Sequence, residues 1–470
     1  MMPSGGPNGR IHLADCPPGR GGGIVEGGLD TMSSAATTPK ADVENTTSAA
    51  VRWYVLIMMV LVYTLSIADR YVVSQVLEPI RLDLHLSEWG VSNVTTLGLA
   101  LFYVVFGFPI SYLIDRYSRR NIIAISLIVW SAMTTLTGRA IGTWTFLCTR
   151  IGVGIGEAGG TPGANSILSD YFPAIRRPMA LTIFSLGAPI GAFVAAQVAG
   201  QIADHYGWRA VFLCFGVPGI IVALLVYFTV PEPKRGVLDH KDDDRSPSFL
   251  ETMRFLWLQR SAVHVMAGSA VTALWGWGLM FYIPTYMLRR FGLSPGGSGD
   301  ILGPIHLFGG IGATLFTGWL LVWPKMADPR RIVRLLGVWV GLATIASIAI
   351  LQTQSLLTVK ILCWIFIPSI YFYIGPCFGV LNNLAQPKMR AIFCASTLFV
   401  ANVGNLIIAP QMVGFLDDFF ATTAAGPDAA SMRLALLCLA PTGFWATIHY
   451  FLAVKNICAD QERATGVPVG

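Results

Sequence analysis

The feature that most constrains this chain is a series of apolar segments, each about 20 residues long, that recurs along most of its sequence. A helix of about 20 residues is long enough to cross the hydrocarbon core of a bilayer. Only 12% of the residues are charged, whereas a soluble domain carries about 25%. Because lipid penalises both charge and unpaired backbone groups, the pattern predicts an all-α membrane protein and argues against a soluble one.

We predict twelve transmembrane helices, which place both termini on the same side of the membrane. Basic residues gather in the tails and connectors on that side, so the positive-inside rule predicts an inner-membrane protein with both termini in the cytoplasm. The predicted spans are residues 53–80, 91–113, 121–140, 144–169, 179–202, 209–230, 262–289, 300–323, 331–351, 356–385, 391–416 and 431–454.

A polar connector separates two halves that look like parallel six-helix repeats. The Gly- and Pro-rich N-terminal tail cannot bury enough apolar surface to order itself, and it does not have the pattern of a signal peptide. Apolar residues at 249 and 255–257 predict a short interfacial helix in the connector. The predicted organisation is a disordered tail over 1–50, an N-terminal bundle over 51–230, a linker over 231–260, a C-terminal bundle over 261–456 and a second tail over 457–470.

Several other classes of function lack support in the sequence. The net charge of +6 is spread over many connectors and does not form a patch, which argues against a nucleic-acid partner. The eight cysteines are scattered without the spacing of metal ligands, so we predict no metal site and no disulfide framework. Phosphate-binding loops and hydrolase motifs are absent from the sequence, so we predict neither an enzyme nor a bound cofactor.

Five motifs in the first half occur in the order typical of the major facilitator superfamily. Serines stand where the first motif usually has two glycines. The resemblance implies two pseudo-symmetric six-helix bundles that work by alternating access. The motifs are the loop from Ser111 to Arg120, Arg150 with Gly154 and Gly156, Asp170 to Pro173 followed by Arg177, Gly187 to Gly191, and Pro231 to Arg235.

A narrower resemblance begins in the first predicted span. The segments Ser66-Ile-Ala-Asp69-Arg70-Tyr71 and Leu77-Glu78-Pro79-Ile80 look like those of the bacterial branch of the spinster family. The resemblance extends over about residues 53–455. It implies proton-coupled export of lysolipids, including sphingosine phosphate and lysophospholipids.

Four charges lie well inside predicted spans one and four. A charge at the bilayer centre costs about 2.5–3.5 kcal/mol, so such residues are expected to face an internal cavity and to pair. We predict that Asp69 and Glu157 couple transport to protons and that Arg70 binds an anionic headgroup. The alternative is an ion-pair network that only fixes helix packing. Structural or gating roles are predicted for Arg150, Asp170 and Arg177.

The second half offers aromatic rings where the first offers charge, so the predicted substrate has a charged head and a hydrocarbon tail. Aromatic residues in membrane helices also pack or face lipid, which is the alternative for this group. Loop residues Asp115, Arg116, Arg119 and Arg120 are predicted to form a cytoplasmic gate, or alternatively a positive-inside anchor. With Arg70, the predicted substrate-binding residues are Trp277, Tyr282, Tyr371, His306 and Asn382.

The sequence therefore predicts a monomeric, proton-coupled secondary transporter of an amphipathic organic anion, lysolipid-like, whose other partner is the lipid bilayer. One alternative keeps the fold and changes the substrate to a small organic acid, a sugar acid or a drug. Another alternative, of a different class, is a non-transporting membrane receptor or sensor.

Overall fold

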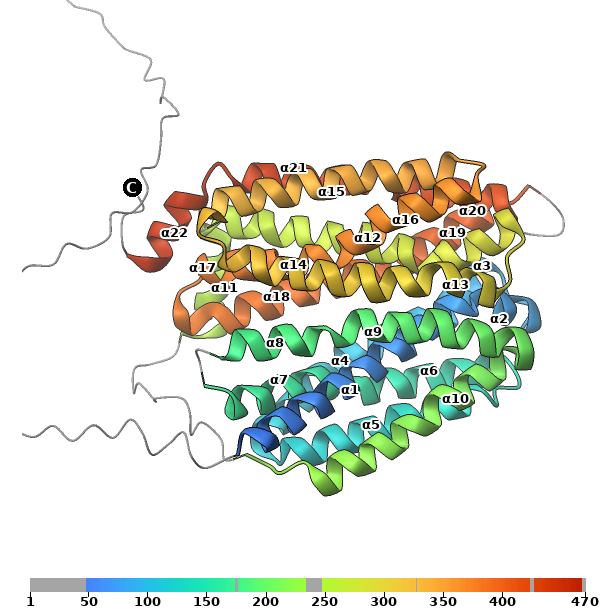
Figure 1. Ribbon diagram of the computed structural model, residues 1–470, viewed down its shortest axis with the longest axis horizontal. Coiled ribbons are helices and arrows are strands. Elements are labelled where there is room, and N and C mark those ends of the chain that lie inside the picture. Colours follow the sequence, from blue (N-terminus) through green and yellow to red (C-terminus); the bar gives the residue numbers. More distant parts are fainter. Residues whose placement is uncertain (1–47, 174–175, 234–246, 327, 423–426, 467–470) are drawn as a thin grey trace, which may run out of the picture.

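The computed structural model describes residues 48–173, 176–233, 247–326, 328–422 and 427–466. Within these ranges the chain forms helices and no β-strand, and the long helices run side by side along one axis (Figure 1). The predicted disordered tail, except for its last residues, and residues 234–246 of the predicted linker lie outside the described residues.

In the N-terminal half, serine side chains cap the starts of α1, α3 and α5. The Ser48 hydroxyl accepts the Val51 amide at 3.3 Å and the Ser118 hydroxyl accepts the Asn121 amide at 3.3 Å, which satisfies N–H groups that lack a helical partner. The helices are α1 (Ala49–Gln75), α2 (Leu77–Asp83), α3 (Glu88–Ser92), α4 (Gly98–Arg116), α5 (Arg119–Thr137), α6 (Thr143–Glu157), α7 (Gly160–Tyr171), α8 (Arg177–Ser185), α9 (Gly187–Phe193) and α10 (Gly200–Thr229), with π-helical segments η1 (Asn93–Leu97) and η2 (Val194–Ala199).

The C-terminal half begins with a short helix, α11, which starts in a capping box between Ser248 and Glu251. Its helices are α11 (Phe249–Leu258), α12 (Arg260–Phe291), α13 (Pro295–Pro304), α14 (Ile311–Val322), α15 (Pro329–Gln352), α16 (Leu356–Phe372), α17 (Ile374–Asn383), α18 (Arg390–Asn402), α19 (Ala409–Phe420), α20 (Ala429–Leu439), α21 (Thr442–Ala453) and α22 (Ile457–Thr465), with η3 (Ile305–Gly310), η4 (Pro324–Met326), η5 (Pro387–Met389) and η6 (Val403–Ile408) between them.

The described residues contain 10 helical stretches that are long and apolar enough to span a membrane. One of them, Arg177–Thr229, holds two passages, because Gly207 has a positive φ of 79° that breaks the helix there. The passage through α6 and α7 is divided at residues 158–159 and falls below the length of an uninterrupted span. When Arg177–Thr229 is counted as two passages and the passage through α6 and α7 is added, the described helices make up twelve passages, as predicted.

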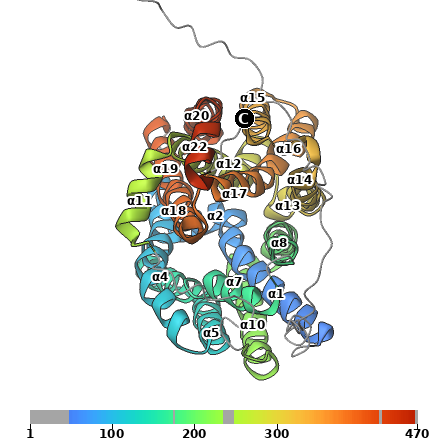
Figure 2. The same cartoon turned by 90° about the vertical axis from the view of Figure 1, so that its left-hand side faces the viewer.

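The two halves form two layers. In Figure 1 the N-terminal half, coloured blue to green, lies below the C-terminal half, coloured yellow to red. Figure 2 shows the same helices nearly end-on. The start of α1 and the helices α11 and α22 lie at one end of the molecule, which we call the tail end (Figure 1). Helices α2 and α3 and the start of α13 lie at the opposite end, which we call the closed end.

Four spans meet where the two halves face each other, and each contains one π-helical segment. Segment η1 contacts η6, η2 contacts α13, and η3 contacts α9. A π-helical turn widens the helix and is frequent at functional sites. The second, fifth, eighth and eleventh spans therefore form part of the interface between the halves, and α1 and α12 also meet there.

Candidate functional site

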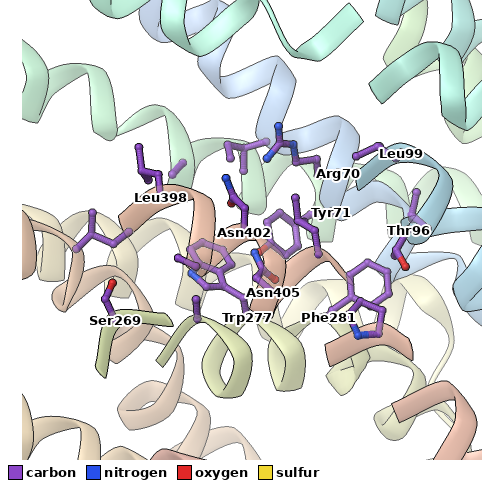
Figure 3. A pocket seen from close by; sticks show the side chains of 18 of the residues that line it. Arg70, Tyr71, Thr96, Leu99, Ser269, Trp277, Phe281, Leu398, Asn402 and Asn405 are labelled. Carbon is purple, nitrogen blue, oxygen red and sulfur yellow. The ribbon is translucent and has the colours of Figure 1, made fainter. Parts of the chain in front are cut away.

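A cavity of about 200 Å³ lies between the two halves (Figure 3). The N-terminal half contributes side chains from α1, η1, α4, α6 and α9, and the C-terminal half contributes side chains from α12, α17, α18 and η6. In Figure 3, Arg70 from α1 lies on the other side of the cavity from Trp277, and Tyr71 from α1 lies beside Trp277 and Asn405. The site therefore depends on residues that are more than 200 positions apart in the sequence.

Arg70 forms the charged part of the N-terminal wall. Its Nε donates to Glu157 Oε2 at 2.6 Å, and its guanidinium lies 4.7 Å from the centre of the Tyr103 ring. The Arg70 side chain keeps 17% of its surface exposed, whereas the Glu157 side chain is fully buried behind it. An incoming anion can therefore reach the guanidinium, while its carboxylate partner is shielded.

A second ion pair lies beside the first. Arg150 Nη1 is 3.8 Å from Asp69 Oδ2, Thr134 donates to Asp69 Oδ1 at 2.7 Å, and Arg150 Nε donates to the Thr95 carbonyl at 3.4 Å. We predicted a structural or gating role for Arg150. The structure places it in the cavity lining and makes it the counter-ion of Asp69.

The four charges sum to zero but are incompletely hydrogen-bonded. Among the described residues, Asp69 Oδ2, Arg150 Nη1 and Glu157 Oε1 are buried without a hydrogen-bond partner. Most buried polar atoms in proteins are paired, so unpaired atoms call for an explanation. These three atoms leave the cluster with free capacity for a proton or a ligand atom.

The opposite wall is mainly aromatic. Trp277 packs against Tyr71 across the interface, with ring centres 5.5 Å apart, and Phe281 and Tyr373 also line the cavity. The Asn402 and Asn405 side chains supply polar groups on this side (Figure 3). The cavity thus combines an ion-paired wall with an apolar one.

Four of the predicted substrate-binding residues lie outside the cavity lining. Tyr282 is fully buried and bonds Ser92 at 2.7 Å and the Pro410 carbonyl at 3.0 Å. Tyr371 packs edge-on behind Trp277 and bonds His306 Nδ1 at 3.0 Å. The Asn382 side chain accepts from Cys394 Sγ at 3.3 Å. Of the six predicted residues, only Arg70 and Trp277 line the cavity.

Several lining residues escaped the sequence reasoning, namely Tyr63, Tyr71, Thr95 and Thr96. A signal for Tyr63 was present, because Tyr63, Ile67 and Arg70 follow the spacing of one helix face. The two threonines had no such signal. Their place in the lining depends on how η1 packs against α6.

The predicted gate residues lie at the tail end. Arg119 is buried and forms ion pairs with Asp170 and with Glu232 Oε1, the latter at 3.0 Å. It also donates a hydrogen bond to the Pro233 carbonyl at 2.9 Å. Arg116 lies over the Tyr112 ring, and Arg120 lies over the Tyr227 ring. The side chain of Asp115 is exposed. Arg177 donates to the Ser169 and Phe172 carbonyls at 2.9 and 3.1 Å.

Glu232 holds the end of α10 against the start of α5. Burial alone would raise the pKa of Glu232, but hydrogen bonds from the Arg120 amide, the Arg119 guanidinium and the Ser118 hydroxyl lower it below the ordinary value. A carboxylate that accepts several hydrogen bonds stays ionised. The contacts of Arg119 and Glu232 fasten segments of the N-terminal half to one another.

The closed end is joined by hydrogen bonds between the halves. Gln75 Nε2 donates to Ser298 Oγ at 2.6 Å, Ser74 Oγ donates to the Phe281 carbonyl at 2.6 Å, and Ser294 Oγ donates to Asp204 Oδ2 at 2.6 Å. The backbones also approach closely, since a Cβ on Gly200 would lie 2.5 Å from the Pro295 carbonyl oxygen. The cavity is therefore sealed at this end.

Comparisons with known proteins agree with this architecture. Residues 59–409 match the Major Facilitator Superfamily. An MFS-type efflux pump of Mycolicibacterium smegmatis is 28% identical, over 87% of this chain and 94% of that protein. The sphingosine-1-phosphate transporter SPNS2 of Xenopus tropicalis is 26% identical, over 85% of this chain and 81% of that protein.

A further relative is the probable galactarate/D-glucarate transporter GudP of Bacillus subtilis, which is 27% identical over 52% of this chain and 59% of that protein. Among solved structures, a bacterial homolog of the human lysosomal transporter spinster, in an inward-facing and unoccupied conformation, superposes with a TM-score of 0.77. It is 28% identical, over 88% of this chain and 99% of that one. The chain is similar to spinster-like transporters, and it belongs to the Major Facilitator Superfamily.

Proposed function

We propose that this transporter moves an amphipathic organic anion of the lysolipid class across the inner membrane, coupled to protons, by alternating access. The observation that carries the proposal is the Arg70–Glu157 pair, which faces a cavity whose opposite wall is aromatic. The concentration of basic residues at the tail end favours an orientation with both termini in the cytoplasm.

Arg70 is the group best suited to the anionic head of the substrate. A guanidinium is always charged, and its planar set of donors matches phosphate and carboxylate oxygens. An anion that binds Arg70 competes with Glu157 Oε2 for the same guanidinium. An anion bound at Arg70 Nε and the Arg70–Glu157 ion pair therefore exclude each other.

This competition supplies a coupling mechanism. A Glu157 carboxylate that loses Arg70 remains buried without a counter-ion, and burial without a partner favours the protonated form. We expect Glu157 to take up one proton when substrate binds and to release it when Arg70 returns. Asp69 keeps Arg150 and Thr134 as partners, so its protonation would follow movement of α6 relative to α1.

The aromatic wall supports a substrate with a hydrocarbon tail. Trp277, Phe281 and Tyr373 offer apolar surface opposite Arg70, and burying an apolar chain contributes about 0.8 kcal/mol per methylene. The name of the Xenopus relative, which specifies sphingosine-1-phosphate, agrees with this class of substrate. A lysolipid would place its headgroup at Arg70 and its chain along this wall.

A second candidate substrate is a small sugar acid. The cavity of about 200 Å³ is small, and the amides of Asn402 and Asn405 could bind hydroxyl groups. The Bacillus relative named for galactarate and glucarate supports this alternative. The two candidates share the anion site at Arg70 and differ in what occupies the wall around Trp277.

The test is uptake of labelled lysolipids and sugar acids into proteoliposomes, with and without a pH gradient. We expect lysolipid flux that the gradient drives. Arg70→Ala should weaken binding of the anion by about 10- to 100-fold, since hydrogen bonds to a charged group contribute about 1.5–3 kcal/mol. Arg70→Lys should restore part of it, because the charge returns without the planar donors.

Glu157→Gln should still exchange substrate but no longer respond to the pH gradient. Arg254→Ala, an exposed arginine on α11, serves as the matched control and should transport normally. If the pH gradient drove flux of sugar acids and not of lysolipids, the sugar acids would replace the lysolipids as the proposed substrate class. Unchanged pH dependence in Glu157→Gln would remove the coupling role from Glu157.

A further inference from the structure

A second buried charge cluster lies at the closed end, away from the cavity. It joins Glu78 and Arg81 of α2, Glu88 of α3, Arg289 of α12 and Asp417 of α19. The side chains of these five residues are between 0% and 11% exposed. We call this group the latch cluster, because Arg289 comes from the C-terminal half while Glu78 and Glu88 come from the N-terminal half.

Arg289 is the centre of the latch cluster. It donates to Glu78, to Glu88 and, from Nη1, to Asp417 Oδ2 at 2.8 Å. Arg81 supports the same carboxylates, at 2.7 Å from Glu78 Oε1 and 2.9 Å from Glu88 Oε1. Opening of this end separates Arg289 from the carboxylates of the other half, so the cluster must break in every transport cycle.

The charges of the latch cluster do not balance. Three carboxylates face two guanidinium groups, which leaves one negative charge in excess. The cluster around Arg70, by contrast, pairs two acids with two arginines. An excess charge in a buried site is costly, because no solvent compensates it.

Two atoms of the latch cluster are buried without a hydrogen-bond partner among the described residues, the donor Arg289 Nε and the acceptor Glu88 Oε2. Of these two residues, the one that can accept a proton is Glu88. Its side chain is fully buried, and Oε2 has no hydrogen-bond partner in the part of the chain that the structure describes. Both arginine contacts of Glu88 fall on the other oxygen, Oε1. A proton on Oε2 would therefore remove the excess charge without displacing either arginine.

The remaining polar groups around Glu88 do not neutralise it. Asp418 of α19 accepts the backbone amides of Glu88 and Trp89, at 2.9 and 2.8 Å, and adds a further negative charge. The Tyr282 hydroxyl of α12 is engaged with Ser92 and the Pro410 carbonyl. The charged groups that face Glu88 from α2, α12 and α19 are Glu78, Arg81, Arg289, Asp417 and Asp418.

We propose that the latch cluster is a second proton-binding site, at Glu88 Oε2, and that protonation there stabilises the conformation closed at this end. The carboxylate takes up one proton while this end is open, and closure traps that proton beside Arg289. The inference rests on the alternating access of the proposed function but not on its substrate or on Glu157.

The test measures the conformational equilibrium without substrate. Spin labels are attached at Ile141→Cys and Gln354→Cys, two exposed loop positions, one in each half, at the closed end. The native cysteines are replaced by alanine. We expect the closed population to grow as the pH falls from about 8 to 6, by at most about tenfold per pH unit for one linked proton.

Glu88→Gln should remain closed at both pH values and lose this response. Asp83→Asn, which alters a carboxylate at the same end paired with Arg209 at 2.8 Å, should keep the wild-type response. If Glu88→Gln cannot be purified folded, Asp417→Asn removes the same excess charge and should also lose the response.

A full pH response in both Glu88→Gln and Asp417→Asn would overturn the proposal. Glu157→Gln in the same labelled protein separates this result from the proposed function. If the pH response disappears in Glu157→Gln and persists in Glu88→Gln, the coupling role of Glu157 is supported and the proton-binding site at Glu88 is refuted.

Discussion

At the scale of single residues, the site is defined by how each buried charge is partnered. Arg70 has an ion pair with Glu157 and an aromatic ring beneath it, and it still reaches the cavity. Asp69 depends on a long ion pair of 3.8 Å and on one neutral donor, Thr134. Because a buried carboxylate with few donors is costly, Thr134 is a sensitive point of the site.

Thr134→Val should destabilise the protein by about 1–3 kcal/mol, since the buried Asp69 carboxylate loses its closest donor. The measurement is the thermal unfolding midpoint of the purified protein in detergent. Thr135→Val is the matched control, because the Thr135 hydroxyl donates to the Ser131 carbonyl of its own helix at 2.8 Å and supports no charged group. Equal midpoints for the two variants would show that Thr134 does not support Asp69.

At the scale of helices, small residues set how closely the spans approach. A Cβ on Gly154 of α6 would lie well within contact distance of the Leu99 backbone carbonyl on α4. A Cβ on Gly191 of α9 would lie 2.5 Å from the Thr64 carbonyl oxygen on α1. Such close backbone contact is how membrane helices gain packing energy where water does not drive association.

Gly154→Val should push α6 away from α4 and destabilise the N-terminal bundle by more than the usual overpacking cost of about 1–3 kcal/mol. It should also weaken substrate binding, because α6 carries Arg150 and Glu157. Gly107→Ala on α4 is the matched control, since a Cβ there meets no atom within 4 Å. Both variants are compared by thermal unfolding and by flux. A fully active, stable Gly154→Val protein would contradict this packing argument.

At the scale of the whole molecule, the halves are fastened at the closed end and enclose the cavity between them. The closed end holds hydrogen bonds and an ionic cluster, which can exchange for water when the halves separate. A cycle that delivers substrate to both sides of the membrane requires this end to open.

Asp204→Cys with Ser294→Cys places one thiol on each half, at positions whose native side chains bond at 2.6 Å. A short reagent that links the two thiols through disulfide bonds should abolish substrate flux in the double variant, because it prevents the closed end from opening. Cleavage of the cross-link by a reducing agent should restore flux. The single variants treated in the same way are the controls. Continued flux after complete cross-linking would argue against alternating access through this end.

The features that follow from the membrane environment and from the chain pattern could be predicted from the sequence alone. Apolar segments of membrane length, the interruption between the halves and the motif order predicted the helices and the fold, because lipid permits few alternatives. The cost of burying charge also singled out Asp69, Arg70 and Glu157 for the interior. The place of Tyr63 in the cavity lining could also be inferred, because Tyr63 lies on the same helix face as Arg70.

Which of the buried polar residues share one site became clear from the packing of the helices in three dimensions. The choice of Arg150 as the partner of Asp69, and the exclusion of Tyr282, Tyr371, His306 and Asn382 from the cavity lining, depend on helix rotation. The latch cluster joins α2 and α3 to α12 and α19, which are far apart in the sequence. Helical periodicity limits the face of each span, but close packing between the spans sets its angle and depth, and those contacts are not local.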